Sequence, residues 1–170
     1  MTVKVNGVPV FLKGANWIPD DCFPTRSESR DRLAARIDQA LAANMNTLRV
    51  WGGGVYAAHD FMELCDERGL LVWHDFMLAC AAYPEEEPYR SEVEAEARDN
   101  VSRLARHPSL AIWNGCNENI WGTFDWGHEW EQLRTQSERT WGLGYYLDLL
   151  PSVVSELAPT VPYWPASPYS

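Results

Sequence analysis

Short apolar runs alternate with helical patterns along most of this chain. The apolar runs predict five strands, at residues 8–14, 46–51, 70–75, 110–113 and 161–164. The Asn6-Gly7 pair before the first run is a turn signal. We therefore expect strands and helices to follow one another in regular order.

The segments between these runs repeat their apolar residues at helical spacing. The first helix is expected after a capping-box pattern at Thr25 and Glu28, and the second is expected to stop at Gly69. Pro151 interrupts the last pattern, which predicts two short helices instead of one straight helix. The four apolar stripes are Leu33, Ile37 and Leu41; Phe61, Leu64 and Cys65; Val93, Ala97, Val101 and Leu104; and Leu147, Leu150, Val154 and Leu157.

This alternation predicts an α/β fold with a parallel sheet and helical crossovers. The spacing suits a (β/α)8 barrel or a doubly wound sheet, and periodicity alone does not choose between them. A complete barrel takes about 250 residues and eight strands, whereas this pattern predicts five strands in 170 residues. We expect the barrel interior to receive Leu48, Val50, Val72 and Ile112, and we interpret Trp73 and Trp113 as core residues.

The composition of the chain argues against two kinds of partner, nucleic acids and membranes. Hydrophobic residues make up 46% of the chain, and the formal net charge is −10. An acidic chain does not favour a nucleic-acid partner, and no apolar run approaches the roughly 20 residues that cross a membrane. The first residues lack the apolar segment of a signal peptide, which slightly favours a cytoplasmic location.

No cofactor is predicted. The Gly52-Gly53-Gly54 run has no Lys-Ser/Thr after it, so it fails as a phosphate-binding loop and is interpreted as a sharp turn. The four histidines show no metal-ligand spacing. The four cysteines lie in or beside apolar stretches, and we expect them to be buried free thiols: Cys22, Cys65, Cys80 and Cys116.

The segment 113–119 carries the most informative chemistry. It begins within the fourth predicted strand and places Glu118 just beyond the strand end. Catalytic groups of barrel enzymes lie at the carboxyl ends of strands, so Glu118 is a candidate catalytic acid. Taken alone, it is equally well interpreted as an acidic residue at a helix N-terminus.

Five segments occur in an order that resembles a known family. Together they look like the first strands of the catalytic domain of glycoside hydrolase family 2 β-mannosidases, and the resemblance extends over nearly the whole chain. The segments are residues 14–19, 48–54, 72–77, 113–119 and 162–168.

The resemblance implies a role for three polar residues. Glu118 matches the acid/base, which protonates the glycosidic oxygen and then deprotonates the attacking water. Asn117 matches the asparagine that binds the 2-hydroxyl of the sugar. Arg49 matches the arginine beside the nucleophile, although an arginine there also suits a structural ion pair.

The resemblance also implies a substrate pocket for one terminal mannose. Trp17, Trp51 and Trp164 would line it, with the barrel core as the alternative for each. Asp75 would contact the pocket or orient its neighbours, and we favour the structural alternative for it.

Two departures from the family are visible. Cys116 stands where asparagine is common in the family. The family's nucleophile is a glutamate near the seventh strand, and no acid after Glu118 matches it, because all of them precede the fifth predicted strand. Those acids are Asp125, Glu129, Glu131, Glu138, Asp148 and Glu156.

Residues 1–170 are therefore expected to form part of a catalytic (β/α)8 barrel, with a β-mannoside oligosaccharide as substrate. Another family 2 exo-β-glycosidase is the alternative, acting on galactosides, glucuronides or glucosaminides. A non-catalytic sugar-binding module is the third hypothesis. Open barrel edges would also favour self-association.

Overall fold

The computed structural model describes residues 2–23, 26, 29–127, 132, 135 and 139–169. Its main feature is a five-stranded sheet in the order β3-β4-β5-β6-β7, in which every neighbouring pair is parallel. The strands are β3 (Gly14–Trp17), β4 (Thr47–Val50), β5 (Leu71–Asp75), β6 (Leu110–Asn114) and β7 (Tyr163–Trp164). Spatial order follows sequence order, as in a barrel wall.

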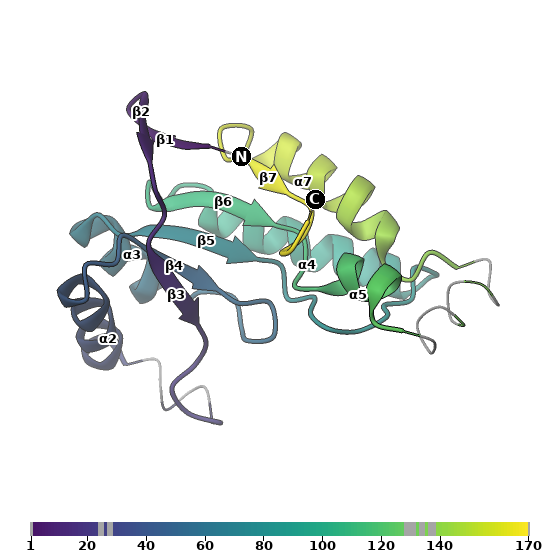
Figure 1. Ribbon diagram of the computed structural model, residues 1–170, viewed down its shortest axis with the longest axis horizontal. Coiled ribbons are helices and arrows are strands. Elements are labelled where there is room, and N and C mark those ends of the chain that lie inside the picture. Colours follow the sequence, from purple (N-terminus) through teal and green to yellow (C-terminus); the bar gives the residue numbers. More distant parts are fainter. Residues whose placement is uncertain are drawn as a thin grey trace.

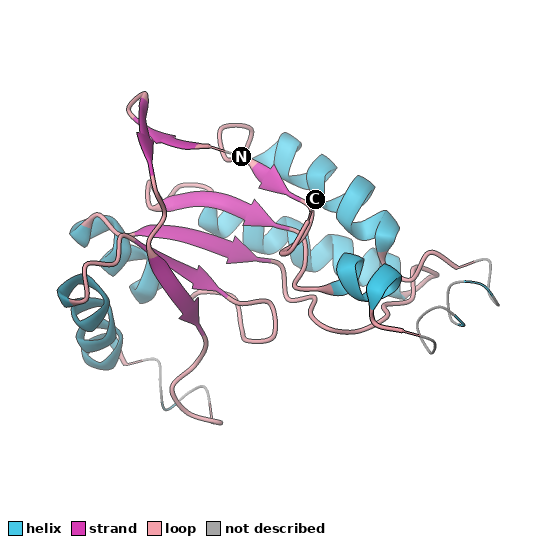
Figure 2. Ribbon diagram, viewed as in Figure 1, coloured by secondary structure: helices cyan, strands magenta, loops and turns pink. Residues whose placement is uncertain are grey.

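Helices connect these strands and cover one face of the sheet (Figures 1 and 2). A parallel pair needs such a crossover, because the chain must return to the starting edge before the next strand begins. The connections contain α2 (Arg30–Ala42), α3 (His59–Arg68), α4 (Tyr89–Leu104), α5 (Asn119–Asp125), η1 (Tyr145–Leu149) and α7 (Leu150–Leu157).

The start of the chain differs from the sequence prediction. The run at 8–14 does not form the first barrel strand. Instead β1 (Val3–Val5) and β2 (Val8–Val10) form an antiparallel hairpin, and the first barrel strand is β3. Both turn residues, Asn6 and Gly7, have positive φ, as tight hairpin turns require, and the backbone of Val8–Val10 pairs with β1 and not with the sheet.

The hydrophobic core lies between the sheet and its helices. The predicted stripes supply much of its helical side: Leu33 and Ile37 from α2, Phe61 and Cys65 from α3, and Val101 from α4 are buried. Gly69 ends α3 in the left-handed conformation at φ 69°, as predicted. The Thr25–Glu28 capping box lies outside the described residues.

The last helical stripe differs from the predicted one at its first residue. The segment does divide in two, but η1 is a π-helical turn that runs directly into α7. A π turn takes up an extra residue. Leu147 is consequently exposed, whereas Leu150 and Val154 are buried as predicted, together with Leu149 and Val153.

Three of the four residues predicted to face the barrel interior lie on the other face of the sheet. Leu48, Val50 and Val72 belong to the core under the helices and do not face the interior. Side chains alternate between the two faces of a strand, so an inward Arg49 places both of its neighbours outward. Of the four predicted residues, only Ile112 lies on the Arg49 face, where it pairs in register with Trp73.

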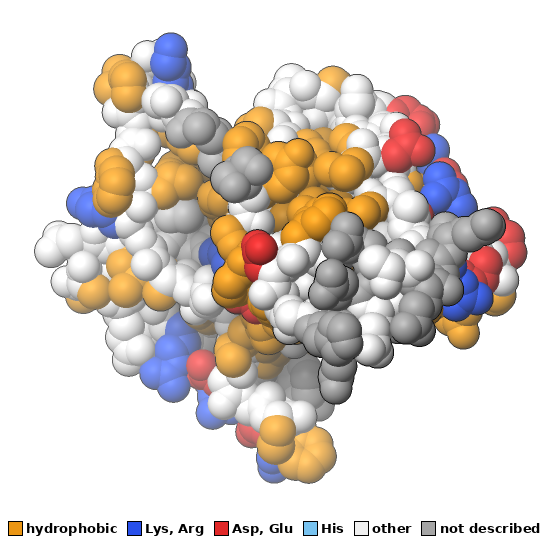
Figure 3. Space-filling model, turned by 45° about the vertical axis from the view of Figure 1, so that its right-hand side comes forward, with side chains coloured by type: hydrophobic (Ala, Val, Ile, Leu, Met, Phe, Trp, Pro, Cys, Tyr) orange, Lys and Arg blue, Asp and Glu red, His pale blue; other side chains and the backbone are white. Residues whose placement is uncertain are grey.

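The sheet ends at β3 on one side and β7 on the other. Apolar side chains are exposed in several places, among them Val8, Phe11 and Ile18 in the first strands and loops and Phe124 in α5. Figure 3 shows hydrophobic side chains gathered across the middle of one face. Among the described residues, no helix has the length and apolar character needed to span a membrane.

Candidate active site

Polar side chains meet where β4, β5 and β6 end. Because parallel strands point the same way, their carboxyl ends lie at one edge of the sheet. Asp75 and Asn114 are register partners at the last positions of β5 and β6. Arg49 comes one residue before the end of β4, and its side chain reaches across to both neighbouring strands.

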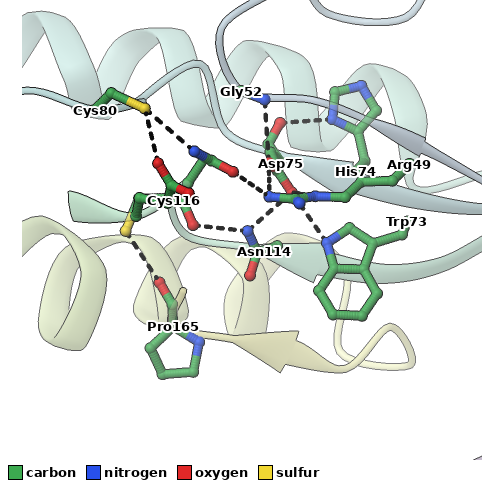
Figure 4. Close-up of polar contacts among 11 residues, drawn as sticks. Arg49, Gly52, Trp73, His74, Asp75, Cys80, Asn114, Cys116 and Pro165 are labelled. Atoms are coloured by element: carbon green, nitrogen blue, oxygen red, sulfur yellow. Dashed lines mark hydrogen bonds and ion pairs between the residues drawn. The ribbon is translucent and has the colours of Figure 1, made fainter. Parts of the chain in front are cut away.

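Asp75 is the centre of this cluster (Figure 4). Its side chain is completely buried and forms an ion pair with Arg49, with Nη2 2.7 Å from Oδ2 and Nε 3.2 Å from Oδ1. Gly52 N (3.1 Å), Trp73 Nε1 (3.0 Å) and Asn114 Nδ2 (2.8 Å) also donate to it. Burial raises the pKa of Asp75, and the Arg49 guanidinium opposes that shift.

Asn117 joins the segment after β6 to this ion pair. Its Oδ1 accepts a hydrogen bond from Arg49 Nη2 at 2.8 Å, and its Nδ2 donates to Cys80 Sγ at 3.3 Å. Isolated parallel bridges to Ala79 and Ser167 fix its backbone on both sides. Arg49 therefore binds Asp75 and Asn117 at the same time, which sets the position of the Asn117 amide.

Glu118 comes four residues after β6 and begins the short helix α5. Its backbone is left-handed at φ 63°, which a non-glycine residue rarely adopts. Its amide N donates to Ser167 O at 3.1 Å, and its Oε2 accepts from Cys80 Sγ at 3.3 Å. Glu118 as a residue is half-buried, in contact with both protein and solvent.

The three predicted pocket tryptophans lie in different places. Trp17 packs against Phe61 of α3, with ring centroids 4.7 Å apart, and thus adjoins the helix-side core. The Trp51 ring covers Gly53. Trp164 is in register with Asn114 and meets Tyr169 edge-on, so of the three it is the one placed by register on the Asp75 face.

Three side chains in this network were not predicted to be there: those of Asn114, which ends β6 beside Asp75, Trp73 and Cys80. Trp73 was interpreted as core, yet its indole N–H donates to Asp75 and its ring lies 6.0 Å from the Arg49 guanidinium. The period-2 pattern could have found it, because Trp73 stands two residues before Asp75. Cys80 contacts Glu118, but nothing in the sequence links a loop cysteine to a residue 38 positions later.

All four cysteines are free thiols, and two of them correct the prediction of burial. Cys65 and Cys116 are buried, and burial raises the pKa of each thiol to about 12. Cys22 and Cys80 are exposed, because both lie in loops outside the packed strands and helices. No group of three or more potential metal ligands occurs within the described residues.

The described acids after Glu118 are Asp125, Asp148 and Glu156. Asp125 and Asp148 are exposed on α5 and η1. Glu156 forms an ion pair with Arg98 of α4 at 2.9 Å. Glu129, Glu131 and Glu138 lie outside the described residues.

This architecture defines a class of protein. Five parallel strands in sequence order, helices on the outer face and a polar cluster at the carboxyl ends form part of a (β/α)8 barrel. Solved structures support this. The chain matches the crystal structure of β-D-mannosidase from Dictyoglomus thermophilum with a TM-score of 0.90 and 44% identity, over 99% of this chain and 20% of that one.

Sequence relatives identify the family. The chain is 52% identical to Capra hircus β-mannosidase over 116 residues, which are 68% of this chain and 13% of that protein. It is 35% identical to Thermothelomyces thermophilus β-mannosidase B over 171 residues, 98% of this chain and 20% of that protein. The chain belongs to the β-mannosidases of glycoside hydrolase family 2 and spans 13–20% of the length of these relatives.

Two further comparisons do not add to the family assignment. A Bacteroides uniformis β-glucuronidase matches 93% of this chain and 18% of its own with a TM-score of 0.69, but at 21% identity it shows the shared fold alone. No family model matches the chain.

Proposed function

We propose that residues 1–170 form part of the catalytic barrel domain of a retaining β-mannosidase, which removes terminal β-D-mannose from the non-reducing end of β-mannosides. The similarity to proteins named β-mannosidase supports the substrate. The observation that carries the site is the Asn117-Glu118 pair, which follows β6 and is tied through Asn117 to the buried Arg49–Asp75 ion pair.

In this proposal Glu118 acts twice. As a carboxylic acid it gives its proton to the glycosidic oxygen while the bond from that oxygen to the sugar breaks. As a carboxylate it then takes a proton from water, whose oxygen attacks the anomeric carbon while the bond from that carbon to the nucleophile carboxylate breaks and frees the enzyme. Asn117 binds the 2-hydroxyl of the mannose, and of the three predicted tryptophans Trp164 is the one whose strand position suits the pocket wall.

Retention needs two carboxyls about 5–5.5 Å apart. Asp75 does not suit the nucleophile, because its oxygens already accept hydrogen bonds from four residues. We propose that the nucleophile comes from a part of the barrel that the relatives have and this chain does not span. The full-length enzyme, meaning a polypeptide of the relatives' length that contains this chain, is therefore the material for activity tests.

Hydrolysis of a panel of nitrophenyl β-glycosides by the full-length enzyme tests the substrate. We expect kcat/KM for the β-mannoside to exceed that for the β-galactoside, β-glucuronide and β-glucosaminide by a factor of about 100 or more, since a polar site rejects a misplaced hydroxyl strongly. Faster cleavage of any of the other three would replace the mannosidase assignment with that family 2 activity.

A further inference from the structure

Cys80 lies in the loop between β5 and α4, 38 residues before Glu118 in sequence. Its backbone is left-handed at φ 51° and is held in place: its amide N donates to Asn117 O at 3.0 Å. The neighbouring residue Ala79 makes a parallel bridge with Asn117. The loop is thus joined to the segment that carries Glu118, and the cysteine is fixed beside it.

The sulfur atom lies between two side chains of the proposed site (Figure 4). Cys80 Sγ donates to Glu118 Oε2 and accepts from Asn117 Nδ2, each at 3.3 Å. Asn117 in turn accepts from Arg49. A continuous chain of hydrogen bonds therefore leads from the buried ion pair to the carboxyl group, through Asp75, Arg49, Asn117, Cys80 and Glu118.

We propose that Cys80 is a positioning residue for Glu118, and this inference rests on the proposed function. The thiol holds the carboxyl group by Oε2, and within the described residues no hydrogen bond occupies Oε1, which is left for the glycosidic oxygen. A glutamate side chain has several rotatable bonds, so a fixed contact restricts it to the reactive orientation.

The thiol keeps its proton throughout the reaction. In the first step Glu118 transfers the proton on Oε1 to the leaving oxygen, and the S–H continues to donate to Oε2. In the second step the ionised carboxylate takes a proton from water, and the same S–H stabilises its charge. A protonated thiol suits this role: partial burial and the hydrogen bond to Glu118 raise the pKa of Cys80.

The first test replaces Cys80 in the full-length enzyme. We expect Cys80→Ala to lower kcat about tenfold with little change in KM, and to move the basic limb of the pH profile of kcat/KM to higher pH. The direction follows because an ionised carboxylate that loses a donor becomes easier to protonate. Cys80→Ser keeps a donor and an acceptor, so it should restore both the rate and the profile.

The charged groups near Cys80 and Glu118 are the same in Cys80→Ala and Cys80→Ser as in the wild type. Arg49 reaches the pair through Asn117, and Asp75 lies behind Arg49. On the loop side, the Tyr83 hydroxyl binds Ala79. A pH profile of Cys80→Ala identical to the wild-type profile, or equal losses in the Ala and Ser variants, would overturn the inference.

The second test does not use activity. In Glu118→Gln the negative charge beside Cys80 is gone, so we expect iodoacetamide to alkylate Cys80 about threefold faster at pH 8, because the thiolate forms more readily. Cys22, the other exposed thiol, is the internal control and should react at the same rate in both proteins. Peptide mass spectrometry gives each rate, and an unchanged Cys80 rate would contradict the contact.

The acid/base role of Glu118 and the positioning role of Cys80 can be refuted separately. If Glu118→Gln loses activity equally on substrates with good and poor leaving groups, the acid/base assignment fails, and the alkylation rate still tests the contact. If Glu118 behaves as the acid but Cys80→Ala behaves as wild type, only the positioning role fails.

Discussion

A single buried carboxylate organises the polar residues at the strand ends. Asp75 accepts from Arg49, Gly52, Trp73 and Asn114, which belong to β4, the turn after it, β5 and β6. A buried charge is tolerated only when it is paired and hydrogen-bonded, so these donors and the carboxylate depend on one another. The sequence could suggest Asp75 as a structural acid, and strand alternation could place Trp73 on the same face, but the meeting of four donors at one carboxylate depends on the folded sheet.

Replacing Asp75 should therefore damage both stability and the site. We expect Asp75→Ala to destabilise the fold by about 3–5 kcal/mol, because it leaves the Arg49 guanidinium partly buried without its partner. The thermal unfolding midpoint of the full-length enzyme measures this. Glu92→Gln, at an exposed position on α4, is the control; a loss no larger than that of the control would contradict the account.

His74 makes the fold sensitive to acid. It is buried and neutral: Nδ1 donates to Asp75 O at 2.7 Å, and Nε2 accepts from Ala57 N at 3.1 Å. Burial lowers its pKa from 6.5 to about 4, and nearby Arg103 acts in the same direction. The unfolded chain therefore takes up a proton between these two pH values, and the folded chain does not.

The stability that His74 allows is complete above pH 6.5 and is lost as the pH falls toward 4. The loss amounts to about 3 kcal/mol. We expect His74→Gln, which keeps an acceptor for the Ala57 amide, to lose correspondingly less stability over this range. Urea unfolding at several pH values measures the difference, and parallel curves for the two proteins would exclude His74 as the cause.

At the scale of elements, strand and helix order could be predicted because each element carries its own periodicity. The strands after the first were found within two residues, since burial on both sides of a parallel sheet produces continuous apolar runs. It was harder to predict which face of the sheet each side chain occupies. In the run 46–51, Thr47 and Arg49 alternate with Leu48 and Val50, and this alternation separates the two faces without saying which of them is the barrel interior.

Other features of the elements depend on contacts that the sequence does not display. The hairpin β1–β2 takes up part of the run at 8–14, and the π turn η1 leaves Leu147 exposed although Leu150 and Val154 of the same stripe are buried. The candidate site likewise has residues that could be located from the sequence and a contact that could not. Glu118 and Asn117 follow a strand and could be located from the sequence, whereas the partnership of Cys80 with Glu118 needs the folded loop.

Close packing between β6 and β7 gives an element-scale prediction. A Cβ added at Gly115 would lie 2.1 Å from the Tyr163 hydroxyl and 2.5 Å from Pro165 O. Gly115→Ala should therefore push the strands apart just before Glu118, at a cost of about 1–3 kcal/mol. We expect a lower melting temperature and a drop in kcat/KM on the order of tenfold.

Gly54→Ala is the matched control, because its nearest new contact would be at 3.2 Å. Equal effects of the two substitutions would show that the β6–β7 contact has no special part in placing Glu118. The Tyr163 hydroxyl also donates to Tyr146 O at 2.6 Å, so the variant should disturb this hydrogen bond too.

At the scale of the whole molecule, the isolated 170-residue chain is expected to be inactive and to self-associate. It offers β3 and β7 as sheet edges, and Phe11 is 83% exposed. Unpaired edges and apolar patches favour association. Light scattering after size exclusion measures the association, and a monodisperse monomer that melts cooperatively, or clear hydrolysis of a β-mannoside, would contradict this prediction.

The central claim is that Glu118 is the acid/base of a retaining β-mannosidase, and Glu118→Gln in the full-length enzyme tests it most directly. An acid matters most when the leaving group is poor. We expect glycosylation of the variant to slow by a factor of about 1,000 for alkyl or sugar leaving groups, but by much less for dinitrophenolate, which leaves without a proton. Equal losses for both kinds of β-mannoside would contradict the assignment.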